Sequence, residues 1–397
     1  MDGKILSAKE CKIIVKKSLL LKHEDGIKII DYVLCKASDE LVDFMGEYYK
    51  LYINTEDPGC TDGVQQLCYF VKSIPTENEF QREECERKRF FHKEYYAYTK
   101  IVPNLQKYAS AECYYARKDL LVLEDLTASH LNLLHLREDE PYKNKHRNLF
   151  LTHLAQLHAA SIAWEDKENV NIGEQYKDEL FEMMLTTINE FYVTSAKGII
   201  YLAEKYIKLQ TAKMPNIFIK DKLHAILMDV EKYTKPSTRA RNALLHRDSW
   251  SRNIFYKFDR KNEPKSLCIV DFALSTYSPP LMTILSYLYG HTNEEERKQH
   301  MQDYLDYYYA EFEARLRTLA LPLDIMTKSA FLEECRRAQL PALILIAITN
   351  PLTLIPEGLS NKLRQENNEK FYYYMNVDRN ELFERVMAID PTYISKM

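Results

Sequence analysis

The spacing of hydrophobic and polar residues changes several times along this 397-residue chain. Over residues 1–35 apolar positions are interrupted by lysines every few residues, which predicts helix up to the segment IKIIDYVLCK (27–36). The segment ELVDFMGEYYKLYIN (40–54) then alternates with a period of two around Met45 and Gly46, which predicts a β-hairpin. A further strand is predicted for QQLCYFVKSIP (65–75), which Pro75 ends.

The rest of the chain divides into a short mixed part and a long helical part. Residues 77–100 are charged and periodic and predict a helix, and ECYYARKDLLVLEDL (112–126) predicts a return to strand. From residue 141 onwards the pattern is mainly helical, interrupted by strands around 243–246 and 267–272. We therefore predict a two-lobed α+β fold, with a small β-rich lobe at 1–125 and a large helical lobe at 126–397.

Composition and charge exclude several partners. The formal net charge is −4, with 28% charged and 46% hydrophobic residues, so no overall basic character favours nucleic acid or an anionic membrane. The longest apolar run, ALILIAI (342–348), is far shorter than the roughly 20 residues that span a bilayer. Lysines in the first segment also argue against a signal peptide. We expect neither a nucleic-acid nor a membrane partner.

The cysteine and glycine contents argue against several kinds of binding site. The eight cysteines form no C-x-x-C pair, which argues against a metal site of that type and against a disulfide framework. A reduced, cytoplasmic location is the expectation. Only 9 of the 397 residues are glycine, which argues against a glycine-rich dinucleotide loop.

The stretch LLHRDSWSRNIF (244–255) concentrates polar side chains between two apolar pieces. Asp248 and Asn253 lie in it, and Asp271 follows eighteen residues after Asn253, at the end of the strand SLCIV. If the strands on either side of YKFDRKNEPKS (256–266) pair, these three side chains converge at one end of a hairpin. Asp271 and Asn253 would then suit Mg²⁺ bound together with phosphates, and Asp248 could orient a hydroxyl and accept its proton.

This order of residues matches the phosphotransfer template of protein kinases: H-R-D, an asparagine five residues later, and a metal-binding D-F. The template predicts a strand lysine that contacts phosphates and pairs with a helix glutamate. Lys72 precedes the predicted helix, and Glu94 lies on it. The template also predicts a hinge for adenine, which corresponds here to Glu124, Asp125 and Leu126.

The chain also resembles the ecdysteroid kinase-like family, which comprises insect relatives of choline and aminoglycoside kinases. The resemblance covers roughly residues 30–360 and is carried by the blocks FVK, F-x-x-E, LVLEDL, LAQLHAAS, LLHRDSWSRNIF and IVDF-x-LS-x-Y-x-x-P. It implies a protein-kinase-like fold, ATP and Mg²⁺ as cofactors, and phosphorylation of a small-molecule hydroxyl, ecdysteroids being the substrates that name the family. Within it, His246 is expected to order the catalytic loop, and His158 is interpreted as a packing residue.

Some positions depart from the family pattern. Arg247 stands where relatives usually have glycine, so its charge faces either a phosphate or solvent. The hairpin expected to cover the phosphates contains only Gly46, whereas kinase loops use several glycines. Ala273 replaces a polar residue, and Thr283 stands where relatives carry an aspartate that braces the catalytic loop. These departures leave open a degenerate kinase that binds a nucleotide or ligand without catalysis.

Two further questions concern the acceptor. A protein kinase is disfavoured, because only eight residues separate Asp271 from Pro280 and no A-P-E follows. The helical segments 170–235 and 280–350 are rich in Tyr, Phe, Leu and Met, which suits a bulky apolar alcohol such as a steroid and equally suits a packed core. We expect a monomer that phosphorylates a small-molecule alcohol.

Overall fold

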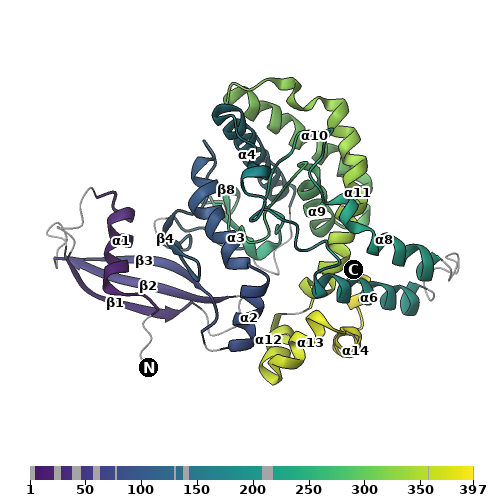
Figure 1. The fold of residues 1–397 in the computed structure, drawn as a ribbon, viewed down its shortest axis with the longest axis horizontal. Helices are drawn as coiled ribbons and strands as arrows, with labels where there is room; N and C mark the ends of the chain where they lie inside the picture. Colours follow the sequence, from purple (N-terminus) through teal and green to yellow (C-terminus); the bar gives the residue numbers. More distant parts are fainter. Residues whose placement is uncertain are drawn as a thin grey trace. The chain divides into compact units, whose positions relative to one another are not determined.

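The structure is a computed structural model of the 397-residue chain (Figure 1). It describes residues 5–21, 28–37, 46–56, 63–76, 78–128, 131–136, 143–207, 218–355 and 357–396. The chain divides into two compact units: residues 1–153 with 250–275, and residues 154–249 with 276–397. Each unit is described by itself. The predicted lobe boundary at 125/126 stays a prediction.

The first unit is built on a five-stranded antiparallel sheet in the order β1-β2-β3-β5-β4. Its strands are β1 (Ile29–Lys36), β2 (Glu47–Glu56), β3 (Val64–Ser73), β4 (Cys113–Arg117) and β5 (Leu120–Glu124). The predicted strands at 65–75 and 112–126 are confirmed, the second of them as the β4–β5 hairpin. The α+β class is likewise confirmed, since this antiparallel sheet is followed by a largely helical second unit.

Alternation along the strands gives the sheet two different faces. One face is apolar: Leu51 and Ile53 of β2 and Val71 of β3 are fully buried against helix α1 (Ala8–Ser18). A capping box between Ser7 and Glu10 starts this helix. Neighbouring positions on β2 and β3 must point to the opposite face, and it is there that Lys72 lies, in register with Tyr48.

Two predictions in this unit were wrong in detail. Residues 29–36 form strand β1 and not the end of a helix, because Ile29, Ile30 and Val33 are β-branched and the segment pairs along β2. The partner of β2 in the hairpin is therefore β1. Residues 40–45 of the predicted hairpin lie outside the described residues.

The single helix predicted for 77–100 was also wrong, because the structure divides it. Helix α2 (Glu79–Arg87) ends at Lys88, and α3 (Phe90–Tyr96) begins after Arg89, whose φ of +57° interrupts the helical backbone. A π-helical turn (Ala97–Ile101) continues α3. The break changes the direction of the chain immediately before the segment that carries Glu94.

A separate hairpin outside the five-stranded sheet completes the first unit. Strands β7 (Ile254–Phe258) and β8 (Pro264–Ile269) pair antiparallel, with Ile254 opposite Ile269. Val270 N–H donates to the Asn253 carbonyl at 3.0 Å, which extends the ladder by one step. Pairing of the strands around 256–266 is thus confirmed, and it brings Asn253 and Asp271 to the same end of the hairpin.

The second unit is mainly helical. Helix α4 (Asn144–Glu168) continues into it from the first unit. Strands β6 (Ala243–Leu245) and β9 (Thr276–Ser278) form a short antiparallel pair, and β6 comes directly before residues 246–248, which we call the HRD segment. The other α-helices among the described residues of this unit are α5 (Ile172–Gln175), α6 (Glu190–Leu202), α8 (His224–Met228), α9 (Leu281–His291), α10 (Glu294–Thr318), α11 (Lys328–Thr353), α12 (Glu357–Glu366), α13 (Asn368–Asn376), α14 (Asn380–Ile389) and α15 (Tyr393–Lys396).

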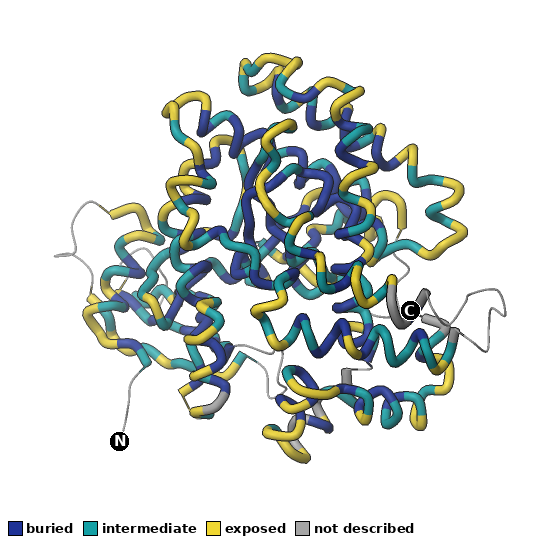
Figure 2. Tube along the Cα trace, turned by 45° about the vertical axis from the view of Figure 1, so that its right-hand side comes forward, coloured by how far each residue is buried: buried dark blue, intermediate teal, exposed yellow. Residues whose placement is uncertain are grey.

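The apolar run at 342–348 lies in α11 and is buried on one face only, since Leu343 is 47% exposed. Figure 2 shows how buried and exposed residues alternate along the helices. Ile344, Leu345 and Ile348 are buried there. The helix continues through Pro341 and Pro351 instead of stopping at them. Across the described part of the chain, no helix combines the length and the apolar character needed to cross a membrane.

Burial of the apolar sheet face predicts which isoleucine matters for stability. Ile53→Ala should lower the free energy of unfolding by about 2–5 kcal/mol, because it leaves a cavity beneath α1. Ile30→Ala on β1, where the side chain is 49% exposed, is the matched control and should cost less than half as much. Urea unfolding of the full chain, followed by circular dichroism, measures both variants. Equal losses would contradict this packing.

Candidate functional site

A buried lysine joins three elements of the first unit. Lys72 Nζ on β3 lies 2.8 Å from Glu94 Oε2 on α3 and 2.8 Å from Asp271 Oδ2 after β8. All three side chains are largely withdrawn from solvent, Glu94 almost completely. One cation therefore faces two carboxylates, and the cluster carries a formal charge of −1. We call Lys72, Glu94 and Asp271 the lysine cluster.

The backbone holds Asp271 in an unusual conformation. Its φ is +67°, in the left-handed region that costs a non-glycine residue of order 1–3 kcal/mol. The Ala273 N–H donates to Asp271 Oδ1 at 3.2 Å, so one carboxylate oxygen faces the backbone and the other faces Lys72. Phe272 is fully buried and packs edge-on against Tyr98 at 5.4 Å between ring centroids. These contacts fix the direction of the carboxylate.

Burial and nearby charge affect Tyr98 as well. Burial, reinforced by the charge of Glu94, raises the pKa of Tyr98 well above its ordinary value. The phenol therefore stays neutral and adds no negative charge to the lysine cluster.

Asn253 supplies a second oxygen at the same end of the β7–β8 hairpin. It ends a short 3₁₀ turn (Ser251–Asn253) and is buried. In the described residues no group of three or more His, Cys, Asp or Glu side chains could hold a metal. Mg²⁺ usually takes only one or two carboxylates and completes its shell with phosphates and water. One carboxylate and one amide oxygen therefore fit a cation that binds together with a nucleotide.

The predicted hinge follows β5 and is held by its own polar contacts. Asp125 accepts hydrogen bonds from Lys50 Nζ of β2 and from Thr127, through both N–H and hydroxyl. Burial alone would raise the pKa of Asp125, but the hydrogen bonds from Lys50 and Thr127 outweigh it and lower the pKa. The Asp125 side chain therefore fixes the turn. A direct contact of this carboxylate with a ligand is not required for that role.

The backbone groups of the hinge differ in whether they already have a hydrogen-bond partner. The Glu124 N–H donates to the Glu112 carbonyl at 2.7 Å, and the Leu126 carbonyl accepts from Leu133 N–H at 2.9 Å. The Leu126 N–H has no hydrogen-bond acceptor among the described residues. Leu126 itself is buried against Cys268 of β8 in a small apolar cluster. One buried donor is thus presented beside an apolar surface, which suits a heteroaromatic base.

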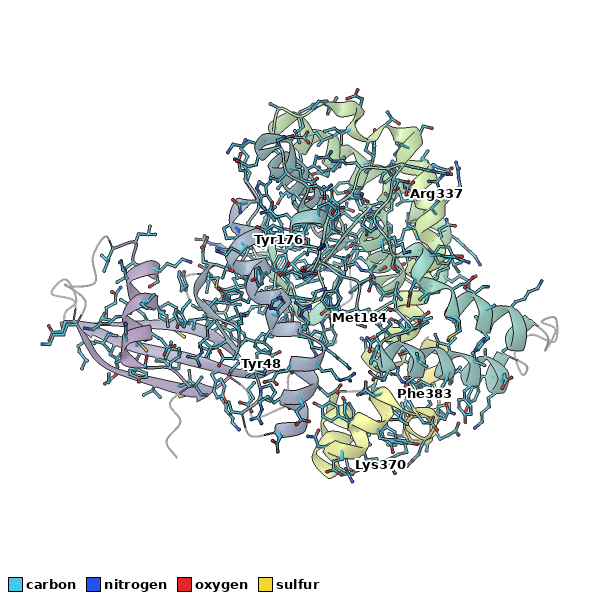
Figure 3. All side chains as sticks on the ribbon, viewed as in Figure 1. Tyr48, Tyr176, Met184, Arg337, Lys370 and Phe383 are labelled. Carbon is cyan, nitrogen blue, oxygen red and sulfur yellow. The ribbon has the colours of Figure 1, made fainter. Side chains whose placement is uncertain are left out.

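The sheet face that carries Lys72 is partly aromatic. Tyr48, labelled in Figure 3, lies opposite Lys72 on β2, and its ring stacks on Phe70 with centroids 5.7 Å apart. Lys50 is on this face too, in register with Phe70. The alternation that predicted Lys72 could also have identified Lys50, but its partner Asp125 could not be found from spacing.

The HRD segment belongs to the second unit. His246 is fully buried, and its Nδ1 accepts a hydrogen bond from the Asp248 N–H at 3.3 Å. This contact orders the backbone around Asp248, whose side chain is half-buried. The structure thus gives His246 a positioning contact, and its assignment to catalysis stays a prediction.

The expectation that Arg247 faces a phosphate or solvent was wrong. Its side chain is 3% exposed, and Nη2 lies 2.8 Å from Glu182 Oε2. The φ of Arg247 is +69°, which explains why glycine suits this position. The ion pair was not predictable, because Glu182 is 65 residues away in the sequence.

Thr283, another departure from the family pattern, and the histidine His158 are both buried in the second unit. Thr283 is buried at the start of α9, and its hydroxyl has no hydrogen-bond partner among the described residues. His158 is fully buried beside Tyr308, with 2.8 Å between Nδ1 and the phenol oxygen. Burial lowers the pKa of His158 to about 3, so it stays neutral. His158 is therefore a packing residue.

Comparisons with known proteins give one sequence family and several distant structures. No curated protein matches the sequence. Among solved structures, a Plasmodium vivax ethanolamine kinase is similar at 13% identity and a TM-score of 0.38, over 100% of this chain and 94% of that one. The streptomycin-ATP-APH(2")-IIa ternary complex gives 13% and 0.32, over 78% and 86%.

A microcompartment-associated aminopropanol kinase gives 11% identity and a TM-score of 0.31, over 84% of this chain and 96% of that one. At such low TM-scores these likenesses carry no argument about the site. The sequence match is different, because the profile of the ecdysteroid kinase-like family covers residues 41–321, more than half of the chain. The chain therefore belongs to the ecdysteroid kinase-like family.

Proposed function

We propose that this protein is an ATP- and Mg²⁺-dependent kinase that transfers the γ-phosphate to a hydroxyl group of a small molecule. The observation that carries the proposal is the lysine cluster, in which Lys72 is shared between Glu94 and Asp271. In this proposal Glu94 stays paired with Lys72, whereas Asp271 gives way to phosphate oxygens of the nucleotide. Family membership supports the same activity.

Within this proposal each residue of the first unit has one role. Glu94 keeps Lys72 oriented, because it is the more deeply buried of the two carboxylates. Lys72 binds phosphate oxygens, and Asp271 with Asn253 would hold Mg²⁺, which neutralises the charge of the triphosphate. The hinge of Glu124, Asp125 and Leu126 binds adenine, with the Leu126 N–H as the donor.

The HRD segment supplies the proton acceptor. Asp248 orients the acceptor hydroxyl and takes its proton as the oxygen attacks phosphorus. His246 holds the backbone of Asp248 through Nδ1, so its contribution is to position the base.

The acceptor is a bulky alcohol, such as an ecdysteroid, bound by the helical second unit. Tyr176 and Met184, labelled in Figure 3, are two of the half-buried apolar or aromatic side chains of this unit that suit such a ligand. We further propose a cytoplasmic monomer, and the free thiols of the seven described cysteines are in keeping with a reducing compartment.

An ATP-consumption screen tests the proposed function. Purified full-length protein should consume ATP with at least one alcohol in a panel of steroid, choline-like and plant-derived compounds. Consumption should stop when EDTA removes Mg²⁺ and return when excess Mg²⁺ is added, because Asp271 and Asn253 approach phosphates only through a cation.

A binding measurement separates nucleotide binding from catalysis. A calorimetric titration with Mg²⁺–ATP should show binding, and the same titration in EDTA should show much weaker binding. Tight binding of ATP that does not depend on Mg²⁺ would contradict the metal assignment. Binding of Mg²⁺–ATP without turnover across the panel would favour a degenerate kinase. The strongest structural argument for that alternative is the buried Thr283 hydroxyl, which has no hydrogen-bond partner in the part of the chain that the structure describes.

The two aspartates should respond differently to removal of their charge. Asp248→Asn should lower phosphotransfer by a factor on the order of 10² or more, as expected for loss of a general base, and leave Mg²⁺–ATP affinity nearly unchanged. Asp271→Asn should weaken Mg²⁺–ATP binding as well as turnover, because the cation loses a charged ligand. Calorimetry with Mg²⁺–ATP and initial rates compare the two. Equal losses of affinity would refute the division of roles.

A further inference from the structure

An irregular segment of the second unit, residues 180–189, precedes α6 and is held by polar contacts. Glu182 Oε1 accepts hydrogen bonds from the Met184 and Leu185 N–H groups at 2.8 and 3.0 Å. Further along, Thr186 and Thr187 donate to Glu231 at 2.8 Å. Because regular secondary structure is missing from these ten residues, such contacts determine their conformation.

Glu182 also reaches the HRD segment. Its second oxygen, Oε2, lies 2.8 Å from Arg247 Nη2, and the arginine side chain is almost fully buried. Removal of one partner of a buried ion pair destabilises the folded protein, because the other charge is left buried and uncompensated. Glu182 therefore ties the 180–189 segment to the residue immediately before Asp248.

The backbone conformation of Arg247 indicates that its ion pair with Glu182 is a specific interaction. A φ of +69° costs a side-chain-bearing residue free energy that glycine would avoid. Arginine at this position therefore accepts a conformational cost and a desolvation cost together. The contact that offsets both is the ion pair with Glu182.

The residues on either side of Glu182 in this segment are apolar. Met183 and Leu185 are buried and anchor the segment in the unit, whereas Phe181 and Met184 are only half-buried. Two half-buried apolar side chains on a segment tied to the HRD backbone form a surface that an apolar ligand can contact.

We propose that Arg247 is a positioning residue: through Glu182 it holds the 180–189 segment against the catalytic loop, so that Phe181 and Met184 form an apolar wall for the acceptor. This inference rests on the proposed function and specifies it further. The acceptor is a molecule whose hydroxyl belongs to a rigid apolar skeleton, and Arg247 sets how tightly that skeleton is bound without contacting it.

Removal of the ion pair tests the proposal. Arg247→Gly takes away the charge and accommodates the positive φ. Glu182 is 14% exposed and keeps its hydrogen bonds from the Met184 and Leu185 N–H groups, so the variant should still fold. Hydrogen exchange of peptides covering 181–189 should become faster by about tenfold or more, and KM for ecdysone, the probe acceptor, should rise by about tenfold. KM for Mg²⁺–ATP should stay within about twofold. Arg239→Ala, which removes an exposed arginine eight residues earlier, is the matched control and should change neither quantity.

Conservative variants identify the ion pair as the cause. Glu182→Gln retains an oxygen for the Met184 and Leu185 amides but loses the charge, so it should shift exchange and KM in the same direction as Arg247→Gly. The double variant should be no worse than Arg247→Gly alone, because both changes break one interaction. Arg247→Lys should restore part of the loss.

The outcomes separate the inference from the proposed function. If Arg247→Gly leaves exchange in 181–189 unchanged, the positioning role is wrong whatever the enzyme does. Faster exchange with an unchanged KM for ecdysone would also overturn it, because the segment would then play no part in acceptor binding. If the parent protein phosphorylates no alcohol, the proposed function fails, and faster exchange together with weaker equilibrium binding of ecdysone in the variant would still support the positioning role.

Discussion

The arrangement of the first unit depends on one buried cation. Lys72 is enclosed together with Glu94 and Asp271, and burial of any of these charges alone would be strongly unfavourable. Strand β3, helix α3 and the chain after β8 must therefore keep their positions for the charges to be compensated. Because the two carboxylates outnumber the cation, the cluster has a net formal charge of −1, which the proposed Mg²⁺ would neutralise.

Two non-glycine residues with positive φ lie in the segments that carry the chemistry. Asp271 is compensated by Lys72 and by the Ala273 N–H, and Arg247 is compensated by Glu182. Strained backbone of this kind persists only where surrounding contacts hold it. In both cases a charge–charge contact supplies this support, so loss of either partner should affect the geometry of the loop before it affects the rest of the unit.

The sequence allowed the prediction of features that follow from short-range pattern. The sequence pattern located β3 and the strand segment 112–126, although not the turn that divides this segment into β4 and β5. The polar connection at 256–266 predicted the hairpin that brings Asn253 and Asp271 together. Alternation placed Lys72 on a strand, and helical periodicity placed Glu94 on a helix. Their ion pair follows from the kinase template and is seen at 2.8 Å.

Other features depend on contacts between residues far apart in the chain. Residues 29–36 look amphipathic in isolation, and pairing with β2 decides that they form a strand. The break at Arg89 has no proline or glycine to mark it. The partners of Lys50 and Arg247, Asp125 and Glu182, lie 75 and 65 residues away, so neither ion pair leaves a local signal. The roles of the site residues remain predictions from the template.

The most direct test is a crystal structure of the protein with Mg²⁺ and a non-hydrolysable ATP analogue, with the Lys72 Nζ distances to Glu94 and Asp271 as the measured quantities. The account predicts that Lys72 keeps its contact with Glu94, exchanges Asp271 for phosphate oxygens, and leaves the Asp271 carboxylate bound to Mg²⁺ beside Asn253. A nucleotide bound while Lys72 remains paired with Asp271 and distant from the phosphates would contradict it.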